Sequence, residues 1–434
     1  MRQKLFSILI CLPLVCAGCD SPPPGRGEGE IASAQGENGR SVQFRVETIA
    51  ANLEVPWAIA FAPDGRIFFT ERAGRVRVIE NSRLRPEPVA TIRDVESTGE
   101  SGLMDLTLHP QFASNHYLYL AYADRGAYAD RGSGERVRSD ERVRSDERVR
   151  SGERAQVVRF VERDGTLAEP QVIIGNIPAA RFHAGTRARF GPDGKLYITT
   201  GDATYRELAQ RLDSLAGKTL RLNDDGSVPP DNPFAGHPDA RPEIWSYGHR
   251  NAQGIAWQPG SDAQFQTEHG PSGFDGPGGG DEVNIIERGQ NYGWPVIHHT
   301  QTIEGAVTPL LEYTPAVAPA SAMFYRGAAF PQFRGNFFFG NLKGECLIRV
   351  SLDGLRAVNQ ERLLQGRYGR IREVAEGPDG AIYFTTSNRD GRGAPAMNDD
   401  RIMRLVPIYN PGEPAVGEMR GMDEIATKAA RVNK

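Results

Sequence analysis

The sequence predicts an all-β protein built from repeated sheets, and three observations support this. A Pro-Asp-Gly turn followed by an alternating strand recurs in the segments that begin at Ala62, Gly191 and Gly377, and His109 begins a degenerate copy. Proline presets the turn, aspartate bonds its own backbone and glycine takes positive φ, so each unit predicts a hairpin. The hydrophobic segments are short and mostly alternating, and no long stretch has helical spacing. For 434 residues with 49 Gly and 30 Pro, one large body of radially arranged sheets fits best.

Residues 1–19 are predicted to be a lipoprotein-type signal peptide. Arg2 and Lys4 precede an apolar run, residues 5–17, that is too short to span a bilayer but suits secretion. The small residues before Cys19 resemble a bacterial lipobox, although leucine would be usual three residues before that cysteine. We therefore expect a periplasmic protein anchored to a membrane by lipid on Cys19, with ordinary cleavage slightly earlier as the alternative.

The composition beyond the signal defines a tether and excludes one class of partner. Residues 20–40 are rich in Pro, Gly, Ser and Glu and are predicted to form a flexible linker. Cys346 is then the only cysteine of the body, so an intramolecular disulfide is excluded. Without Arg2 and Lys4 the net charge is −6, which gives no basis for a nucleic-acid surface.

Residues 124–154 form a low-complexity insertion in which the unit ERVRSD recurs. Each unit carries two positive and two negative charges, so the insertion is not a basic patch. Its valines recur every six residues and make no helical stripe. We interpret it as a solvated extension of a hairpin loop without a specific role.

His183 is the first candidate catalytic residue. It lies in the Gly-containing loop ARFHAGTRARF, directly before a predicted strand, at the inner end of a repeated sheet where binding sites gather. A lone loop histidine is more often structural. Beside Arg187 and Arg189, however, a neutral imidazole would have its pKa held down, which suits a general base near neutral pH.

Further stretches supply hydrogen-bond donors and positive charge. Each alone would be an ordinary solvated edge or loop, but several cationic loops in an acidic protein suggest one polyanionic small molecule. The donors are Arg250, Asn251 and Gln253 in SYGHRNAQG, Lys343 in a tight turn between two strands, and Arg370 and Arg372, which are two apart and so share one face of a strand.

These motifs resemble the soluble quinoprotein glucose dehydrogenase and aldose sugar dehydrogenase family. VPWAIAFAPDG, GLMDLTLHPQF, HAGTRARFGPDGKLYITTGD, SYGHRNAQGIAW, DEVNIIERGQNYGWP and NLKGECLIRV occur in the family's order, and the resemblance covers residues 44–405. It implies a six-bladed β-propeller of four-stranded antiparallel sheets that holds pyrroloquinoline quinone and calcium.

The resemblance also implies roles for individual residues. His183 matches the catalytic base, and Glu100 falls where the glucose enzyme has a glutamine near the sugar. The matches to cofactor contacts are Arg250, Asn251, Gln253, Lys343, Arg370 and Arg372. Arginine and lysine would neutralise the three carboxylates of the quinone.

Calcium is implied at the backbone carbonyls of Gly270 and Pro271. Carbonyl oxygens suit this hard ion. The loop is also acidic, with Glu268, Asp275, Asp281 and Glu282 nearby. A plain Gly-rich surface loop is the alternative, and residues 272–280 are longer than the family's usual link, which bears on substrate choice.

The implied reaction is oxidation of an aldose at C1 to a lactone. The C1 hydroxyl gives its proton to His183, while its hydride passes to C5 of the quinone, held electrophilic by calcium, Arg250 and Lys343. The sequence has no CxxCH haem motif, so the electrons must leave to an external acceptor that the sequence does not name. A homodimer is compatible with the sequence but is not indicated by it.

Two alternatives from other classes remain open. A calcium-dependent sugar lactonase on a propeller would use a metal site and a loop base without needing the converging cations. A noncatalytic binding module would keep the turns but could lose His183. In all three cases the propeller is expected over residues 41–407, with residues 408–434 as a tail that is mobile or lies on the surface.

Overall fold

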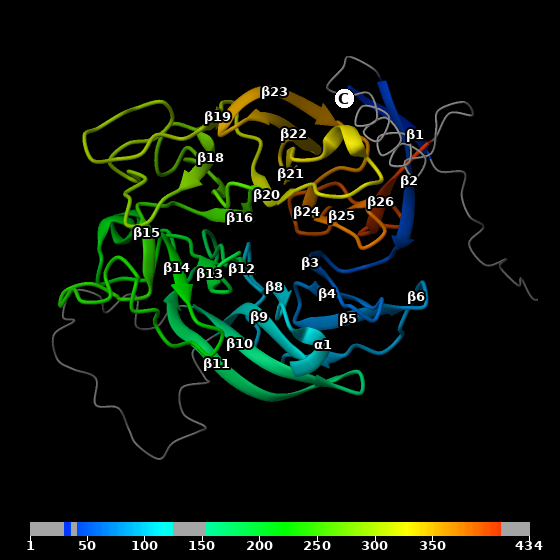
Figure 1. Cartoon of the computed structure of the whole chain (residues 1–434), viewed down its shortest axis with the longest axis horizontal. Coiled ribbons are helices and arrows are strands. Elements are labelled where there is room, and N and C mark those ends of the chain that lie inside the picture. Colours follow the sequence, from blue (N-terminus) through cyan, green and yellow to red (C-terminus); the bar gives the residue numbers. More distant parts are fainter. Residues whose placement is uncertain (1–29, 36–40, 125–152, 409–434) are drawn as a thin grey trace, which may run out of the picture.

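The computed structural model describes residues 30–35, 41–124 and 153–408, and it confirms the six-bladed β-propeller. Six antiparallel sheets, which we call blades 1 to 6, stand in a ring around a central axis (Figure 1). Helix is scarce in the described residues, where α1 (Phe112–Asn115) and short 3-10 turns are the examples. No helix among the described residues is long and apolar enough to cross a membrane.

The blades follow one another along the chain. Blade 1 contains β3 (Pro56–Phe61), β4 (Ile67–Glu71), β5 (Arg75–Glu80), β6 (Arg83–Leu84) and β7 (Ala90–Thr91). Blade 2 contains β8 (Leu103–Leu108), β9 (Tyr117–Asp124), β10 (Arg154–Arg163) and β11 (Thr166–Pro178). Blade 3 contains β12 (Ala188–Phe190), β13 (Leu196–Thr199), β14 (Lys218–Leu222) and β15 (Ile244–Tyr247). Blade 4 contains β16 (Ala252–Trp257), β17 (Gln264–Glu268), β18 (Asp281–Ile286) and β19 (Leu311–Tyr313). Blade 5 contains β20 (Pro319–Phe324), β21 (Phe337–Asn341), β22 (Cys346–Asp353) and β23 (Arg356–Leu363).

Blade 6 closes the ring by joining the two ends of the propeller. Its strands are β24 (Ile371–Glu376), β25 (Ile382–Thr386), β26 (Ile402–Pro407), β2 (Ser41–Ala50) and β1 (Glu30–Gln35). Strand β2 pairs antiparallel with β26, so the first and last segments of the body share one sheet. Strand β1 then pairs with β2 from Glu30 opposite Val46 to Gln35 opposite Ser41.

Strand β1 corrects one expectation. Residues 20–40 were predicted to be a flexible linker on composition alone, but residues 30–35 form an added edge strand of blade 6. Residues with weak strand preference pair here because the open edge of β2 supplies ready backbone partners.

The Pro-Asp-Gly turns take the same place in three blades, as predicted. They connect the first and second strands of blades 1, 3 and 6. In blade 3, Gly191 N–H donates to the Lys195 carbonyl at 2.9 Å and Asp193 accepts from the Lys195 N–H at 3.0 Å. Gly194 has a φ of +71°, so the turn needs a residue that tolerates the left-handed region of backbone conformation. In blade 2, the segment after His109 replaces the turn with α1.

The blades pack face to face through apolar side chains. Between blades 4 and 5, the ring of Phe265 on β17 meets Phe324 at 5.0 Å and Phe337 at 5.3 Å between centroids. All three side chains are buried. Such stacked sheets hold each inner strand at the axis, from which the functional loops project.

A buried ion network crosses the axis. Arg187, directly before β12, donates from Nη1 to Asp105 of β8 at 2.9 Å and to Glu373 of β24 at 2.7 Å. Arg189 contacts the same two carboxylates at 2.6 and 3.2 Å, and Ser321 of β20 donates to Glu373 at 2.9 Å. The network therefore joins blades 2, 3, 5 and 6 at the centre of the ring.

Several sequence-based expectations lie outside the described residues. These are the signal peptide, most of the insertion and the C-terminal tail. The ends of the insertion are described: Asp124 of β9 pairs directly with Arg154 of β10. The insertion thus leaves and rejoins the propeller at one end of a hairpin.

Replacing Arg187 with Met tests the ion network. The change leaves Asp105 and Glu373 with less compensation for their buried charge, so we expect unfolding free energy to fall by about 3–5 kcal/mol near pH 7. Burial already raises the pKa of Glu373, against the opposing effect of Arg187 and Arg189. Without Arg187 this pKa rises further, so the folded variant binds more protons than the unfolded chain above the ordinary carboxyl pKa. The loss of stability should therefore be smaller at pH 5 than at pH 7 in denaturant titrations.

Arg163→Met is the matched control. Arg163 and Glu169 form an ion pair whose side chains are 60% and 56% exposed, and such pairs contribute at most about 1 kcal/mol. Equal stability of the two variants, or a loss for Arg187→Met that does not depend on pH, would contradict the role given to the network.

Candidate functional site

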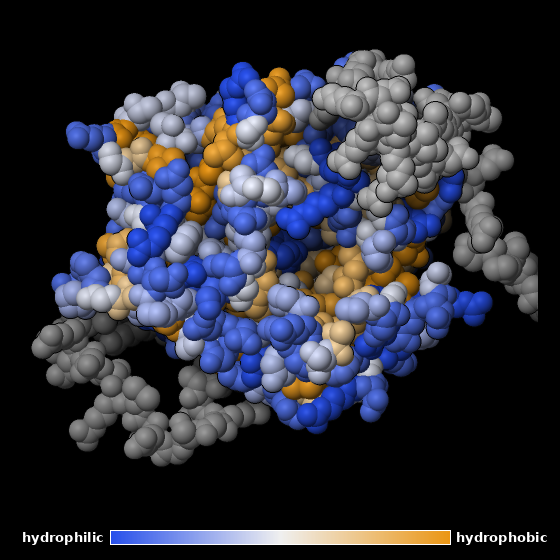
Figure 2. Space-filling view, viewed as in Figure 1, coloured by the Kyte–Doolittle hydropathy of each residue, from blue (hydrophilic) through white to orange (hydrophobic). Residues whose placement is uncertain are grey.

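A cavity of about 790 Å³ opens at one end of the ring axis. Its walls come from the loops that enter the inner strands and from the loops between the second and third strands of the blades, because antiparallel order brings both kinds of loop to the same end. Figure 2 shows the molecule hollowed near the middle of the ring. The volume lies within the range of about 300–1,000 Å³ for small-molecule sites.

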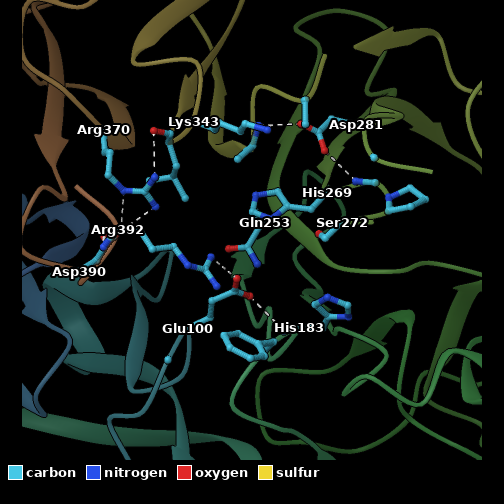
Figure 3. Close-up of a pocket in the computed structure, with 18 of the residues that line it drawn as sticks. Glu100, His183, Gln253, His269, Ser272, Asp281, Lys343, Arg370, Asp390 and Arg392 are labelled. Atoms are coloured by element: carbon cyan, nitrogen blue, oxygen red, sulfur yellow. Dashed lines mark hydrogen bonds and ion pairs between the residues drawn. The ribbon is translucent and has the colours of Figure 1, made fainter. Parts of the chain in front are cut away.

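The cavity gathers most of the predicted site residues (Figure 3). Arg250 and Asn251 are not among the residues that line the cavity, but they contact His183 and Glu100, which do. The predicted residues that line the cavity are Glu100, His183, Gln253, Gly270, Pro271, Lys343, Arg370 and Arg372. Loops from five blades thus converge on one space, as the polyanion hypothesis requires.

His183 lies at the buried side of the cavity with both ring nitrogens engaged. Its Nδ1 is 2.7 Å from Asp202 Oδ1, and its Nε2 is 2.8 Å from the Arg250 guanidinium. Guanidinium groups only donate hydrogen bonds, so Nε2 is the acceptor and the proton of the neutral ring is assigned to Nδ1. The side chain is 4% exposed. The basic lone pair therefore belongs to Nε2.

Asp202 fixes this orientation, and the sequence reasoning missed it. Trp294 Nε1 donates to its Oδ2 at 2.8 Å, and the Thr204 N–H donates to its Oδ1 at 2.7 Å. The available signal was its position three residues after the strand, at the end of KLYITTGD. A buried carboxylate behind a histidine holds the tautomer and stabilises the protonated ring.

The expected basic neighbours of His183 were wrong. Arg187 and Arg189 follow it closely in sequence, but their side chains turn to the axis and bind Asp105 and Glu373. Arg250 contacts the imidazole instead. The two arginines are two apart and so lie on one face, and the buried carboxylates of Asp105 and Glu373 pair with both of them. Proximity in sequence to His183 therefore did not give proximity of charge.

Arg250 is a buried connector behind the cavity. Its Nε donates to Asp275 Oδ2 at 2.8 Å, and its Nη atoms donate to the His269 carbonyl at 3.1 Å and to Ser272 Oγ at 3.0 Å. Its backbone N–H donates to Glu268. Residues of the segment that follows β17 therefore hold the Arg250 guanidinium in place at His183.

The opposite wall carries a cluster of arginines. Arg370 donates to Asp390 Oδ2 at 2.8 Å and to the Leu342 carbonyl at 3.1 Å. Arg372 lies over the Trp57 ring at 3.6 Å. Burial lowers the pKa of Arg372 to about 9, and Arg370 and other arginines act in the same direction against Asp390. A bound anion would relieve this repulsion.

Lys343 lies beside the arginine cluster in the turn between β21 and β22, as predicted. It is exposed, and within the described part of the chain its ammonium group enters no ion pair. Its charge is therefore available to a ligand. The carboxylates of a quinone cofactor fit this donor set of one lysine and several arginines.

Glu100 and Arg392 form an ion pair at the cavity wall. Glu100 Oε1 accepts from Arg392 at 2.6 Å, and Oε2 accepts from the backbone N–H of His183 at 3.1 Å. Burial raises the pKa of Glu100, but His269, Arg392 and that N–H outweigh burial and hold it at about 2. The carboxylate beside the base is thus ionised at neutral pH. Arg392 was not predicted, because it comes from the distant β25–β26 connection.

The two residues predicted to bind calcium through their carbonyls lie at the cavity wall. Gly270 and Pro271 line the cavity, and the Gly270 N–H donates to Asp281 Oδ1 at 2.8 Å. The Pro271 carbonyl accepts from Gly279 at 3.2 Å and keeps a second lone pair. Across the described ranges no three His, Cys, Asp or Glu side chains form a metal cluster. Two carbonyls are fewer than the ~6–8 oxygen ligands of calcium, so a bound ion would also need ligand and water oxygens.

The acidic side chains near these carbonyls have other partners. Asp281 Oδ2 accepts from the N–H groups of Val317 and Ala318, both at 2.7 Å. Glu268 accepts from His249, and Asp275 accepts from Arg250. Burial, followed by the charge of Glu268, raises the pKa of Glu282 well above its ordinary value. These carboxylates organise the loop rather than point together at an ion.

The chain belongs to the glucose/sorbosone dehydrogenase family, whose model matches residues 53–403. It is 35% identical to the aldose sugar dehydrogenase YliI of Escherichia coli, covering 80% of this chain and 91% of that protein. It is 30% identical to quinoprotein glucose dehydrogenase B of Acinetobacter calcoaceticus, covering 88% and 91%. The PQQ-bound aldose sugar dehydrogenase of Streptomyces coelicolor superposes with a TM-score of 0.69 at 30% identity, over 84% of this chain and 98% of that one. These relatives support an oxidoreductase of the sugar dehydrogenase class.

Proposed function

We propose that the protein is a pyrroloquinoline quinone-dependent aldose sugar dehydrogenase that oxidises the C1 hydroxyl of aldoses to lactones. The observation that carries the proposal is the cavity itself, in which an oriented histidine faces a cationic wall. Lys343, Arg370 and Arg372 would hold the carboxylates of the quinone. The relatives named as aldose sugar and quinoprotein glucose dehydrogenases add support.

His183 would act as the general base. Nε2 is its unprotonated nitrogen, so the C1 hydroxyl must reach Nε2, where the Arg250 guanidinium now donates. As the proton moves to Nε2, Asp202 balances the charge of the imidazolium through Nδ1. When bound, the quinone supplies an electrophilic carbonyl that accepts the hydride from C1, and calcium would strengthen this polarisation. Glu100 and Arg392 would contact the sugar hydroxyls, and Gln253 would contact the cofactor.

The cellular setting is part of the same proposal. Cleavage before Cys19 and lipid attachment would place the enzyme in the periplasm at a membrane. The electrons would pass to an external acceptor. The decisive experiment adds pyrroloquinoline quinone and Ca²⁺ to the purified protein and measures oxidation of several aldoses with an artificial electron acceptor. Failure to take up the quinone would overturn the proposal, and the lactonase and binding-module alternatives would then be tested.

His183→Ala should separate chemistry from cofactor binding. It removes the proton acceptor and leaves the cationic wall, so quinone uptake should stay near the wild-type value while kcat falls by at least about 10²-fold. Spectroscopic quinone titration and steady-state kinetics measure the two effects. His237→Ala, in an exposed loop, is the matched control and should behave as the wild type. Aldose oxidation by His183→Ala at the wild-type rate would remove this residue from the mechanism.

Asp202→Asn should lower kcat by about 10²- to 10⁴-fold at unchanged quinone affinity. The amide can present its N–H to Nδ1 and so favour the tautomer in which Nε2 carries the proton. Comparison of kcat with quinone uptake tests this. A variant with normal kcat would show that the carboxylate has only a structural role.

Lys343→Ala should chiefly weaken cofactor retention. The side chain is exposed, so we expect a loss of binding free energy at the low end of the range for a charged hydrogen bond. This is about 1.5 kcal/mol, or roughly a tenfold rise in Kd. Equilibrium titration with the quinone measures the change. Arg356→Ala removes a cation that is 73% exposed on the outer strand of blade 5 and should leave Kd unchanged. Equal Kd values for the wild type and Lys343→Ala would exclude this contact.

A further inference from the structure

Phe274 lies at the mouth of the cavity and against the base. Its side chain is 68% exposed, whereas His183 beneath it is 3% exposed. The two rings are stacked, with centroids 5.8 Å apart and planes inclined by 25°. A single exposed phenyl group is ordinary. This one lines the cavity and reaches the residue that would take the substrate's proton.

The segment that carries Phe274 is anchored on both sides. The Ser272 N–H donates to Asp275 Oδ1 at 2.9 Å, and Arg250 binds both Asp275 and Ser272. Further along, the Gly280 N–H donates to Thr314 Oγ1 at 2.9 Å. The phenyl group therefore sits between residues that are fixed to the wall of the cavity, and a ligand would meet a preorganised ring.

The stack leaves most of the phenyl group exposed. A centroid separation of 5.8 Å is that of an offset stack, so the imidazole covers only part of the phenyl face. The Nε2 lone pair lies in the imidazole plane and accepts from Arg250 in this structure. A substrate hydroxyl group would therefore displace that contact and arrive in the same plane. The ring that bears this hydroxyl group then lies alongside the phenyl group.

We propose that Phe274 is the platform on which the pyranose ring of the substrate packs. The inference rests on the proposed function. A pyranose has a polar rim and apolar C–H faces. Glu100, Gln253 and Arg392 offer the polar groups of the cavity, and Phe274 offers an open apolar surface beside the base. Removal of the C–H face from water against this ring supplies affinity without a hydrogen bond.

The first test measures sugar binding to the full-length protein without quinone. Methyl α-glucopyranoside is the probe, because it has the pyranose ring but no free C1 hydroxyl group to oxidise. Saturation-transfer difference NMR should show transfer to its ring C–H protons with the wild type and with Phe274→Tyr. With Phe274→Ala the dissociation constant should rise about five- to tenfold, as expected for the loss of part of a phenyl contact. Leu355→Ala, at a side chain 44% exposed in the turn between β22 and β23, is the control.

The second test uses the quinone-loaded enzyme. Phe274→Ala should raise KM for glucose by a similar factor with kcat within about twofold, and Phe274→Tyr should restore KM. Unchanged probe binding and unchanged KM in Phe274→Ala would overturn the platform, even if the wild type oxidises aldoses. Equal losses in kcat and in thermal stability would also overturn it, by showing a structural role. Probe binding that depends on Phe274 in a protein that takes up no quinone would support the platform and overturn the proposed dehydrogenase.

Discussion

The ion network at the ring axis is the interaction on which the site depends. Asp105 and Glu373 are buried carboxylates from blades 2 and 6, and Arg187 joins them from blade 3. Buried charges persist only when they are paired, so the three inner strands must keep one relative position. His183 lies four residues before Arg187, and Arg372 is adjacent to Glu373. The network therefore fixes the relative position of two segments, one that carries the proposed base and one that carries the cationic wall.

The two sides of the cavity differ in how their charges are compensated. On one side, Asp202 and Arg250 engage both nitrogens of His183, which sets the tautomer in advance of substrate. On the other side, positive charge exceeds what Asp390 balances, and burial together with the neighbouring arginines lowers the pKa of Arg372. The proposed base is thus held in one tautomer with its lone pair on Arg250, whereas the cations of the other side are not fully balanced. This asymmetry favours a permanently bound polyanion on the cationic wall and an exchangeable neutral substrate beside the base.

The segment after β17 serves both sides of this arrangement. Ser272 and Asp275 hold Arg250, whose guanidinium contacts His183. Gly270 and Pro271, the proposed calcium ligands, directly precede Ser272. Phe274, which lies between Ser272 and Asp275 in the sequence, stacks on the imidazole. A longer loop at this point would change the surface offered to a substrate, while Ser272 and Asp275 still hold the arginine. Loops on a rigid scaffold can vary in this way because the sheets below them carry the stability.

The sequence by itself determined the repeated turns, the all-β class and several members of the site. The turns depend on local backbone preferences, and Lys343, Arg370 and Arg372 were found because a tight turn and strand alternation place them predictably. Their convergence was inferred from the resemblance and from their shared charge. Only the tertiary structure decided which groups meet: Arg250 reaches His183 across 67 residues, and Arg392 reaches Glu100 across 292. It also turned Arg187 and Arg189 toward the axis and drew residues 30–35 into a strand. These outcomes depend on closure of the ring, which brings distant segments together and which no local pattern encodes.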